Sequence, residues 1–80
     1  MLCPRPVSVK PVENYNLIVC FDNGETKIFN VTPYLIGDWF GKLRDPSEFE
    51  TVHISGKHVE WRGGQDIAPH ELYENSVAYI

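Results

Sequence analysis

The chain of 80 residues lacks the features that mark several large classes of protein. It has no apolar run near the roughly 20 residues that a membrane-spanning helix needs. Its first residues also lack the basic and then apolar layout of a secretory signal. Its two cysteines, Cys3 and Cys20, are too few for a disulfide framework. We therefore expect a cytoplasmic protein with no membrane segment, a buried Cys20 and an incidental Cys3.

Positive charge is also scarce in this chain. Seven Lys and Arg residues stand against eleven Asp and Glu residues, which leaves a formal net charge of −4. No Lys or Arg follows Arg62, so the last third of the chain is acidic. Affinity for a phosphate backbone needs clustered basic residues. We therefore expect that the chain does not bind nucleic acid by itself.

The residues that are present suffice for one small core. Two Trp, four Tyr and four Phe residues belong to a hydrophobic fraction of 42%. A chain of this length can bury roughly 60% of the surface of its unfolded state. We find no internal repeat and no low-complexity segment. The length predicts a single domain over residues 1–80, with a core at about 6–74 and an apolar tail at 75–80.

The clearest local signal is the pair Asn23-Gly24 between two β-prone runs. Both residues adopt a positive φ at low cost, so the pair predicts a β-hairpin. A two-residue turn would place Phe21 opposite Thr26. A three-residue loop with a left-handed Gly24 would place Phe21 opposite Glu25. The pattern leaves both registers open.

The two strands predicted nearest the N-terminus, residues 6–12 and 17–21, differ in how apolar residues are distributed over their two faces. Residues 17–21 are apolar on both faces, which is typical of a strand near the middle of its sheet. Residues 6–12 alternate weakly, with Val7 and Val9 on one face, and prolines bracket them. Proline cannot donate to a β-ladder, so we predict a short edge strand over residues 6–12.

A second hairpin is predicted around Gly56-Lys57, a Gly-first pair suited to a type II′ turn. The resulting register places His53 opposite Glu60. One face of this hairpin is polar, whereas the other carries only the apolar residues Val52, Ile54, Val59 and Trp61. Such alternation is typical of a sheet with one face on the core and one in water.

The segment between the hairpins predicts a helix. Thr32 suits the N-cap and Pro33 suits the first helical position. Gly37 and Gly41 oppose a helix, because each costs about 1 kcal/mol relative to alanine. The alternative is an irregular turn and then a helix over about 37–44. Five apolar residues share one helical stripe in this segment: Leu35, Ile36, Trp39, Phe40 and Leu43.

Two further helical turns begin at prolines. Pro46 starts a single turn that delivers Phe49 to the core, and Pro69 starts a short C-terminal helix with Ile67 and Leu72 as a hydrophobic staple. Together the elements predict an α+β fold. Its antiparallel sheet has about five strands, made of two β-hairpins and the N-terminal edge strand. The sheet packs against one central helix, with the short C-terminal helix beside it.

The residues that carry chemistry do not assemble into a catalytic set. His53 and His58 share the polar face with Glu60, but the two histidines are diagonal partners, roughly 7–8 Å apart at the backbone. We expect solvated side chains there rather than metal ligands. Cys20 lies inside an apolar strand, where desolvation disfavours a thiolate. We therefore predict no enzymatic activity, no metal and no cofactor.

We assign the candidate partner or ligand surface to five residues near the C-terminus: Trp61, Gly64, Asp66, His70 and Tyr73. Asp66 follows two glycines and precedes a helix, so it either accepts backbone N–H bonds at that turn or faces a partner. Trp61 also lies on the apolar face of its strand, which favours the core. An alternative function is a small-molecule or catalytic site around Trp61, Asp66 and His70.

The order of motifs resembles a widespread bacterial family of small domains without an assigned function. The resemblance rests on Leu17-x-Val-x-Phe-x-Asn-Gly24, Phe40-x-x-Leu43, Asp45, Phe49, Trp61-x-x-Gly64, Asp66-Ile67, Pro69 and Leu72-Tyr73. It implies antiparallel strands against a helix, in domains that occur alone or ahead of a helix-turn-helix domain. It also implies a neighbouring small gene, in a toxin–antitoxin-like arrangement. His70 departs from the family pattern, where an acid is common. No catalytic residues carry over.

These observations lead to one principal hypothesis about function. We expect a non-catalytic protein-interaction or regulatory module whose partner is the product of a neighbouring gene. Addition of a partner strand at a sheet edge would be the physical mode of binding. The apolar residues 77–80 predict either a homodimer or a strand that docks at the sheet edge.

Overall fold

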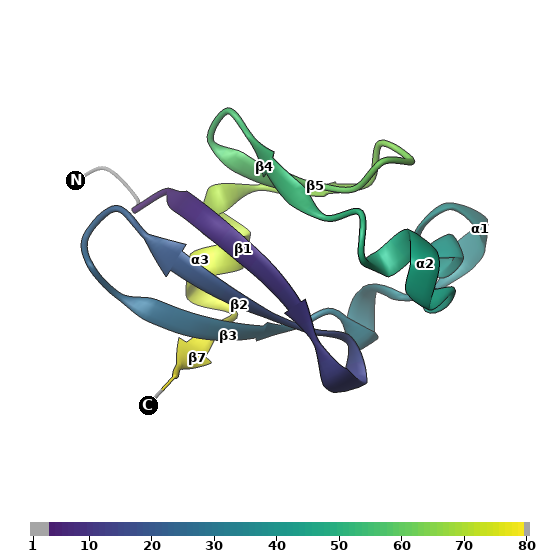
Figure 1. Ribbon diagram of the computed structural model, residues 1–80, viewed down its shortest axis with the longest axis horizontal. Helices are drawn as coiled ribbons and strands as arrows, with labels where there is room; N and C mark the ends of the chain where they lie inside the picture. The colour runs from purple at the N-terminus through teal and green to yellow at the C-terminus, as the bar shows by residue number, and fades with distance from the viewer. Residues whose placement is uncertain (1–3, 80) are drawn as a thin grey trace.

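The protein folds into two antiparallel sheets joined by short helical turns (Figure 1). The computed structural model describes residues 4–79, so the predictions about Cys3 and Ile80 lie outside the described residues. Sheet A has the strand order β1-β2-β3-β7, with the bounds Pro6–Val12, Asn16–Phe21, Thr26–Asn30 and Val77–Ala78. Sheet B has the order β4-β5-β6, with the bounds His53–Ser55, His58–Glu60 and Asp66–Ile67.

The predicted α+β class with antiparallel strands is confirmed, but the single sheet of about five strands is wrong. The two hairpins lie in separate sheets. A strand of two residues is added to each sheet: β7 to sheet A and β6 to sheet B. A strand of two residues has no alternation that a sequence pattern could detect. The short strands exist because an established edge offers them unpaired backbone groups.

The first hairpin takes the three-residue loop. The Phe21 N–H donates to the Glu25 carbonyl at 2.8 Å, and the Gly24 N–H donates to the Phe21 carbonyl at 3.0 Å. Gly24 has a φ of +89°, which a side chain would make costly. Cys20 is therefore opposite Thr26. The strand β2 lies inside sheet A, as its two apolar faces predict.

The same loop geometry recurs between sheet B strands. The Trp61 N–H donates to the Gln65 carbonyl at 2.8 Å, and the Gly64 N–H donates to the Trp61 carbonyl at 2.9 Å. Gly64 has a φ of +92°. This loop turns the chain back so that Ile67 pairs with Val59. A residue with a side chain would be strained at this φ, so the loop favours glycine at position 64.

The second hairpin has the predicted register. His53 is opposite Glu60 and Ser55 is opposite His58, and Gly56 takes a φ of +61° in the turn. Val59 and Trp61 are fully buried, whereas His53 is exposed. The alternation of polar and apolar residues therefore sets which face of sheet B meets the core.

The edge strand β1 has the predicted bounds, but it contains a β-bulge. Pro6 is opposite Phe21 and Ser8 is opposite Cys20, so Val7 is an extra residue in the ladder. Val7 is 54% exposed. The prediction that Val7 and Val9 share a face is therefore wrong, because the bulge breaks the period of two. At the other edge of sheet A, β7 pairs with β3. Of the two predictions for the apolar tail, this pairing matches a strand that docks at the sheet edge.

The prediction of one central helix that begins at Thr32 and Pro33 is wrong, and the alternative of an irregular turn followed by helical turns over about 37–44 is closer to the structure. Residues 32–44 form three short turns instead: the 3-10 turn η2 (Thr32–Tyr34), the helix α1 (Gly37–Phe40) and the 3-10 turn η3 (Gly41–Arg44). Gly37 has a φ of +77°, which ends any helix from the N-terminal side. Ile36 and Trp39 are 73% and 51% exposed, so the apolar stripe does not form. Thr32 is not the N-cap either, because it is the first residue of η2 and Val31 occupies the N-cap position.

The two proline-initiated turns occur as predicted. The helix α2 spans Pro46–Phe49, and the helix α3 spans Pro69–Glu74. The Asp45 carboxylate caps α2 by accepting the Ser47 N–H at 3.0 Å. Phe49, Ile67 and Leu72 are buried, as their positions next to these helix starts predict. No helix among residues 4–79 is long and apolar enough to cross a membrane.

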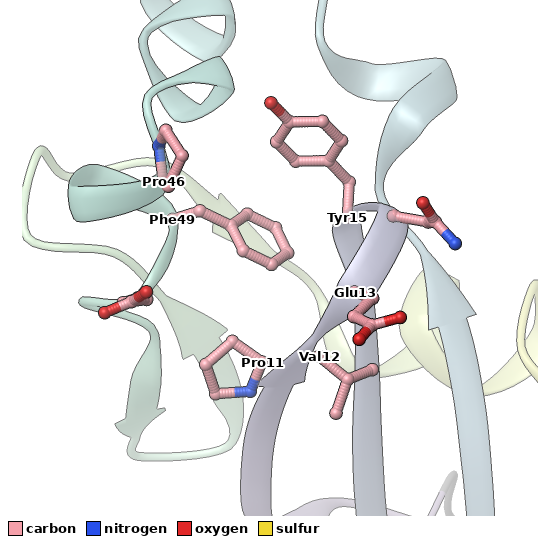
Figure 2. A pocket seen from close by; sticks show the side chains of 8 residues that line it. Pro11, Val12, Glu13, Tyr15, Pro46 and Phe49 are labelled. Carbon is pink, nitrogen blue, oxygen red and sulfur yellow. The ribbon is translucent and has the colours of Figure 1, made fainter.

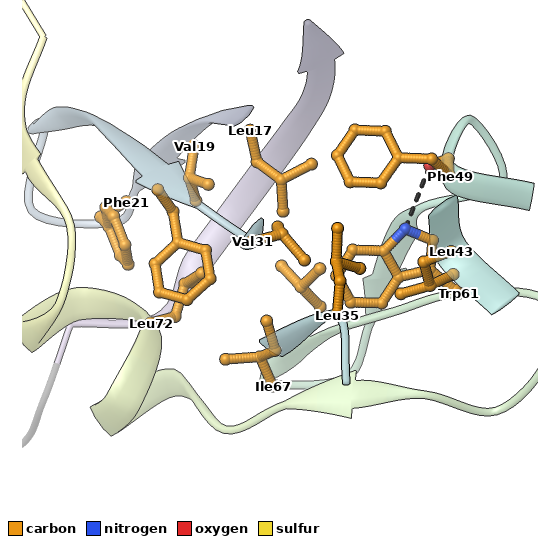
Figure 3. Close-up of a cluster of buried hydrophobic side chains, with 12 residues drawn as sticks. Leu17, Val19, Phe21, Val31, Leu35, Leu43, Phe49, Trp61, Ile67 and Leu72 are labelled. Atoms are coloured by element: carbon orange, nitrogen blue, oxygen red, sulfur yellow. Dashed lines mark hydrogen bonds between the residues drawn. The ribbon is translucent and has the colours of Figure 1, made fainter. Parts of the chain in front are cut away.

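Buried side chains from both sheets form one core cluster (Figure 3). Leu17, Val19 and Phe21 project into it from β2, and Leu72 reaches it from α3. Trp61 enters from the end of sheet B, and its indole N–H donates to the Phe49 carbonyl at 3.0 Å. The core therefore fixes α2 against sheet B, which positions the site described next.

Candidate functional site

The five residues of the predicted surface lie in different parts of the structure. The Trp61 side chain is 1% exposed and belongs to the core, as its strand face predicts, so it presents no surface to a partner. Gly64 forms the loop that follows it. Asp66 lies on the polar face of sheet B, and its carboxylate is 3.7 Å from His58. His70 is exposed on α3 and lies 3.8 Å from Glu74.

Tyr73 joins α3 to the first hairpin. Its hydroxyl donates to the Glu25 carboxylate, and its carbonyl accepts a bond from Lys27 Nζ at 2.9 Å. The Lys27 Nζ also lies 3.9 Å from the centre of the Tyr73 ring. The Tyr73 hydroxyl, helped by Asn23, holds the pKa of Glu25 below its usual range. These contacts give Tyr73 a structural role.

A second tyrosine–carboxylate bond ties η2 to α3. The Tyr34 hydroxyl donates to Glu71 at 2.5 Å. Burial, and then the bond to Glu71 and its negative charge, raise the pKa of Tyr34 to about 12. The phenol therefore stays protonated and keeps its partner throughout the physiological range of pH.

The polar face of sheet B carries two histidine–carboxylate pairs. His53 Nε2 is 3.6 Å from Glu60, and His58 Nε2 is 3.7 Å from Asp66. Within residues 4–79, no group of three or more His, Cys, Asp or Glu side chains is placed to hold a metal ion. The pairs are partly exposed, so each contributes little to stability.

Cys20 differs from the prediction. It lies on the open face of sheet A and is partly exposed, with its Sγ 3.6 Å from Thr26 Oγ1. Hydrogen bonds from the Ser8 and Thr26 side chains lower the pKa of the Cys20 thiol, more than burial raises it. The expectation of a disfavoured thiolate is therefore wrong, because neighbouring hydroxyl groups solvate the charge.

We expect Cys20 to react with iodoacetamide with a pH midpoint below the ordinary cysteine pKa of about 8.5, because its pKa is lowered. The measurement is the alkylation rate against pH in a Cys3→Ser background. Ser8→Ala removes the largest cause of the shift, so it should move the midpoint upward. A midpoint at or above the ordinary value in both proteins would contradict this assignment.

A pocket lies between the 3-10 turn η1 (Glu13–Tyr15) and α2, shown in Figure 2. Its volume is about 400 Å³. The Tyr15 and Phe49 rings and Pro11 surround the same space, with Pro46 beyond the rings. Eight residues line the pocket, which we call the η1–α2 pocket: Pro11, Val12, Glu13, Asn14, Tyr15, Pro46, Phe49 and Glu50.

Backbone strain in η1 builds one wall of the pocket. Asn14 and Tyr15 both have a left-handed backbone, with φ values of +62° and +59°. Asn adopts this region readily, whereas Tyr does so at a cost of the order of 1 kcal/mol or more. The Tyr15 hydroxyl donates to the Arg44 carbonyl at 2.5 Å, and its ring meets the Phe49 ring edge-on with centres 5.3 Å apart. These contacts hold the strained turn in place.

The rim of the pocket is negatively charged. Glu13 and Glu50 line it and are exposed, and neither carboxylate has a hydrogen bond or an ion pair with another of residues 4–79. No Lys, Arg or His lines the pocket. Its lining also contains no Cys, Ser or Thr that could act as a nucleophile.

This pocket could not be predicted from the sequence. The turn at residues 13–16 and the α2 start at Pro46 are each visible as local signals. Nothing in the pattern indicates that these two segments meet, because they are more than thirty residues apart. The one available hint is that the two lining segments, residues 11–15 and 46–50, each contain a proline, an aromatic residue and a glutamate.

The structure is a small α+β domain of two antiparallel sheets with short helices. The chain belongs to a family described as "Protein of unknown function (DUF2442)", whose model matches residues 6–78. This confirms the resemblance to a family of domains without an assigned function. Comparisons with curated proteins and with solved structures gave no match.

Proposed function

We propose that this chain is a non-catalytic protein-interaction module that binds its partner at the η1–α2 pocket. The observation that carries the proposal is the largely apolar pocket of about 400 Å³, whose lining contains no Cys, Ser, Thr or His. Concave apolar sites with a few polar groups are the usual places for ligands and for anchoring side chains. A strained turn kept at such a site also supports a role in binding.

The proposal extends to a regulatory role as one half of a toxin–antitoxin-like gene pair. The partner would be the product of a neighbouring gene, and a second copy of the chain is a further candidate. Sedimentation velocity of the chain alone, and then with the neighbouring product, separates these two partners. Trp61, Asp66 and His70 give less support to the alternative of a small-molecule or catalytic site, since Trp61 is buried and His70 pairs with Glu74.

The test is to map the partner site by NMR. The ¹⁵N-labelled chain is titrated with the unlabelled, purified product of the neighbouring gene. We expect the amide signals that move most to belong to residues 11–15 and 46–50, because these segments line the pocket. Shifts concentrated elsewhere, such as on the polar face of sheet B, would overturn the pocket as the site. An absence of binding would overturn the gene-pair proposal.

A further inference from the structure

We propose that the η1–α2 pocket accepts an arginine side chain from a partner protein segment, with lysine as a weaker substitute. This inference rests on the proposed function, because it names the chemistry of the partner at the same site. It follows from three properties of the pocket: its apolar and aromatic walls, its acidic rim and the lack of any cation in its lining.

The walls suit the long apolar stem of a basic side chain. Pro11, Val12 and Pro46 supply apolar surface, against which the methylene groups of arginine can pack. The half-buried Tyr15 supplies an aromatic ring, and the Phe49 ring, which is 5% exposed, packs edge-on behind it. A guanidinium group binds aromatic rings better than an ammonium group does, because it is planar and more weakly hydrated. The walls therefore favour arginine over lysine.

The rim supplies the complementary charge. Glu13 and Glu50 line the pocket and are exposed, and their side chains have no ion pair with another of residues 4–79. The arginines of the described chain are engaged elsewhere: Arg5 with Asp22, Arg44 with the Leu35 carbonyl and Arg62 with Glu48. A cationic partner is therefore favoured there, and an anionic one is opposed.

The net charge of the chain acts in the same direction. A formal charge of −4 creates a negative field that attracts basic segments and speeds their association at low salt. The pocket then selects among these segments by shape, since exposed carboxylates alone bind cations weakly. The combination predicts binding that weakens as the salt concentration rises but does not vanish.

The experiment uses three capped tripeptides with the full-length chain. They carry arginine, lysine or citrulline between two alanines, and citrulline has nearly the shape of arginine without its charge. We expect the arginine peptide to shift the amide signals of residues 11–15 and 46–50 in NMR titrations. We expect its dissociation constant to be at least about fivefold lower than that of the citrulline peptide, with the lysine peptide between them.

Paired variants test the role of the rim. The double variant Glu13→Gln with Glu50→Gln should weaken binding of the arginine peptide by about tenfold, as expected for two lost charge contacts. The matched control is Asp38→Asn with Glu74→Gln, which removes two exposed carboxylates that do not line the pocket. The control should change the dissociation constant by less than about twofold. Thermal unfolding confirms that both variants fold.

Three outcomes would overturn the inference. The citrulline peptide could bind as tightly as the arginine peptide, the rim variant could bind as well as the control, or the arginine peptide could leave the signals of the pocket residues unmoved. None of these results would overturn the proposed function, because the mapping with the neighbouring gene product tests that separately. If that product maps to the pocket and the arginine peptide fails, the pocket takes a neutral segment instead.

Discussion

Replacing Trp61 with alanine is expected to lower the free energy of unfolding by about 3–5 kcal/mol, the usual cost of removing a buried large aromatic side chain. The Trp61 ring is 1% exposed and packs near the Phe49 ring, with centres 6.1 Å apart. Its indole N–H also donates to the Phe49 carbonyl, which would lose its partner. Small domains have a total stability of about 5–15 kcal/mol, so this loss is a large part of the total.

Urea unfolding followed by circular dichroism measures this loss. Trp39→Ala is the matched control, because Trp39 is the other tryptophan of the chain and is 51% exposed. It should cost roughly 1 kcal/mol or less, including its bond to the Gly63 carbonyl at 3.3 Å. Trp61→Phe keeps most of the ring volume and still leaves the Phe49 carbonyl unpaired, so its cost should lie between the two. Equal losses for Trp61→Ala and Trp39→Ala would refute this account of the core.

Replacing Leu72 with alanine is expected to cost about 2–5 kcal/mol. Leu72 is fully buried, and it is the main residue through which α3 reaches the core. A helix of six residues cannot be stable on its own. The Leu72 contact, together with the bonds of Tyr34 and Tyr73, therefore holds α3 in place and keeps β7 at the edge of sheet A.

The same unfolding measurement applies, with a control from the same helix. His70→Ala should change the stability by less than about 0.5 kcal/mol, because the His70 side chain is 73% exposed and its pair with Glu74 is at the surface. A loss for Leu72→Ala as small as the loss for His70→Ala would show that α3 does not depend on the core. A large loss for His70→Ala would show a role that its contacts do not explain.

Local turn chemistry made half of the fold predictable. The register around Gly56-Lys57 follows from the turn residues and from strict alternation, and it is correct at each pair in β4 and β5. The starts of α2 and α3 follow from Pro46 and Pro69, since proline fits the first turn of a helix and few other helical positions. In each case the information lies within a few residues of the element that it specifies.

Two predictions failed, one for a local reason and one because of residues on neighbouring strands. Leu35, Ile36, Trp39, Phe40 and Leu43 have helical spacing. The structure nevertheless buries Leu35 and Leu43, and it exposes Ile36 and Trp39, because Gly37 takes a left-handed backbone. Cys20 also lies in an apolar strand, yet Ser8 from β1 and Thr26 from β3 lower the pKa of its thiol. Ser8 and Thr26 lie on the two neighbouring strands, so the residue pattern along β2 does not show their effect on the Cys20 thiol.

From its sequence alone, this chain could be read as an antiparallel α+β domain with two hairpins, a small core and an acidic surface. Turn residues and the period of two are local properties, so they can be interpreted without knowledge of the fold. The η1–α2 pocket is different, since it requires residues 11–15 and 46–50 to meet. That meeting depends on how Phe49 packs against Tyr15 and Trp61. Packing is a property of the whole core, so only the folded chain reveals the site.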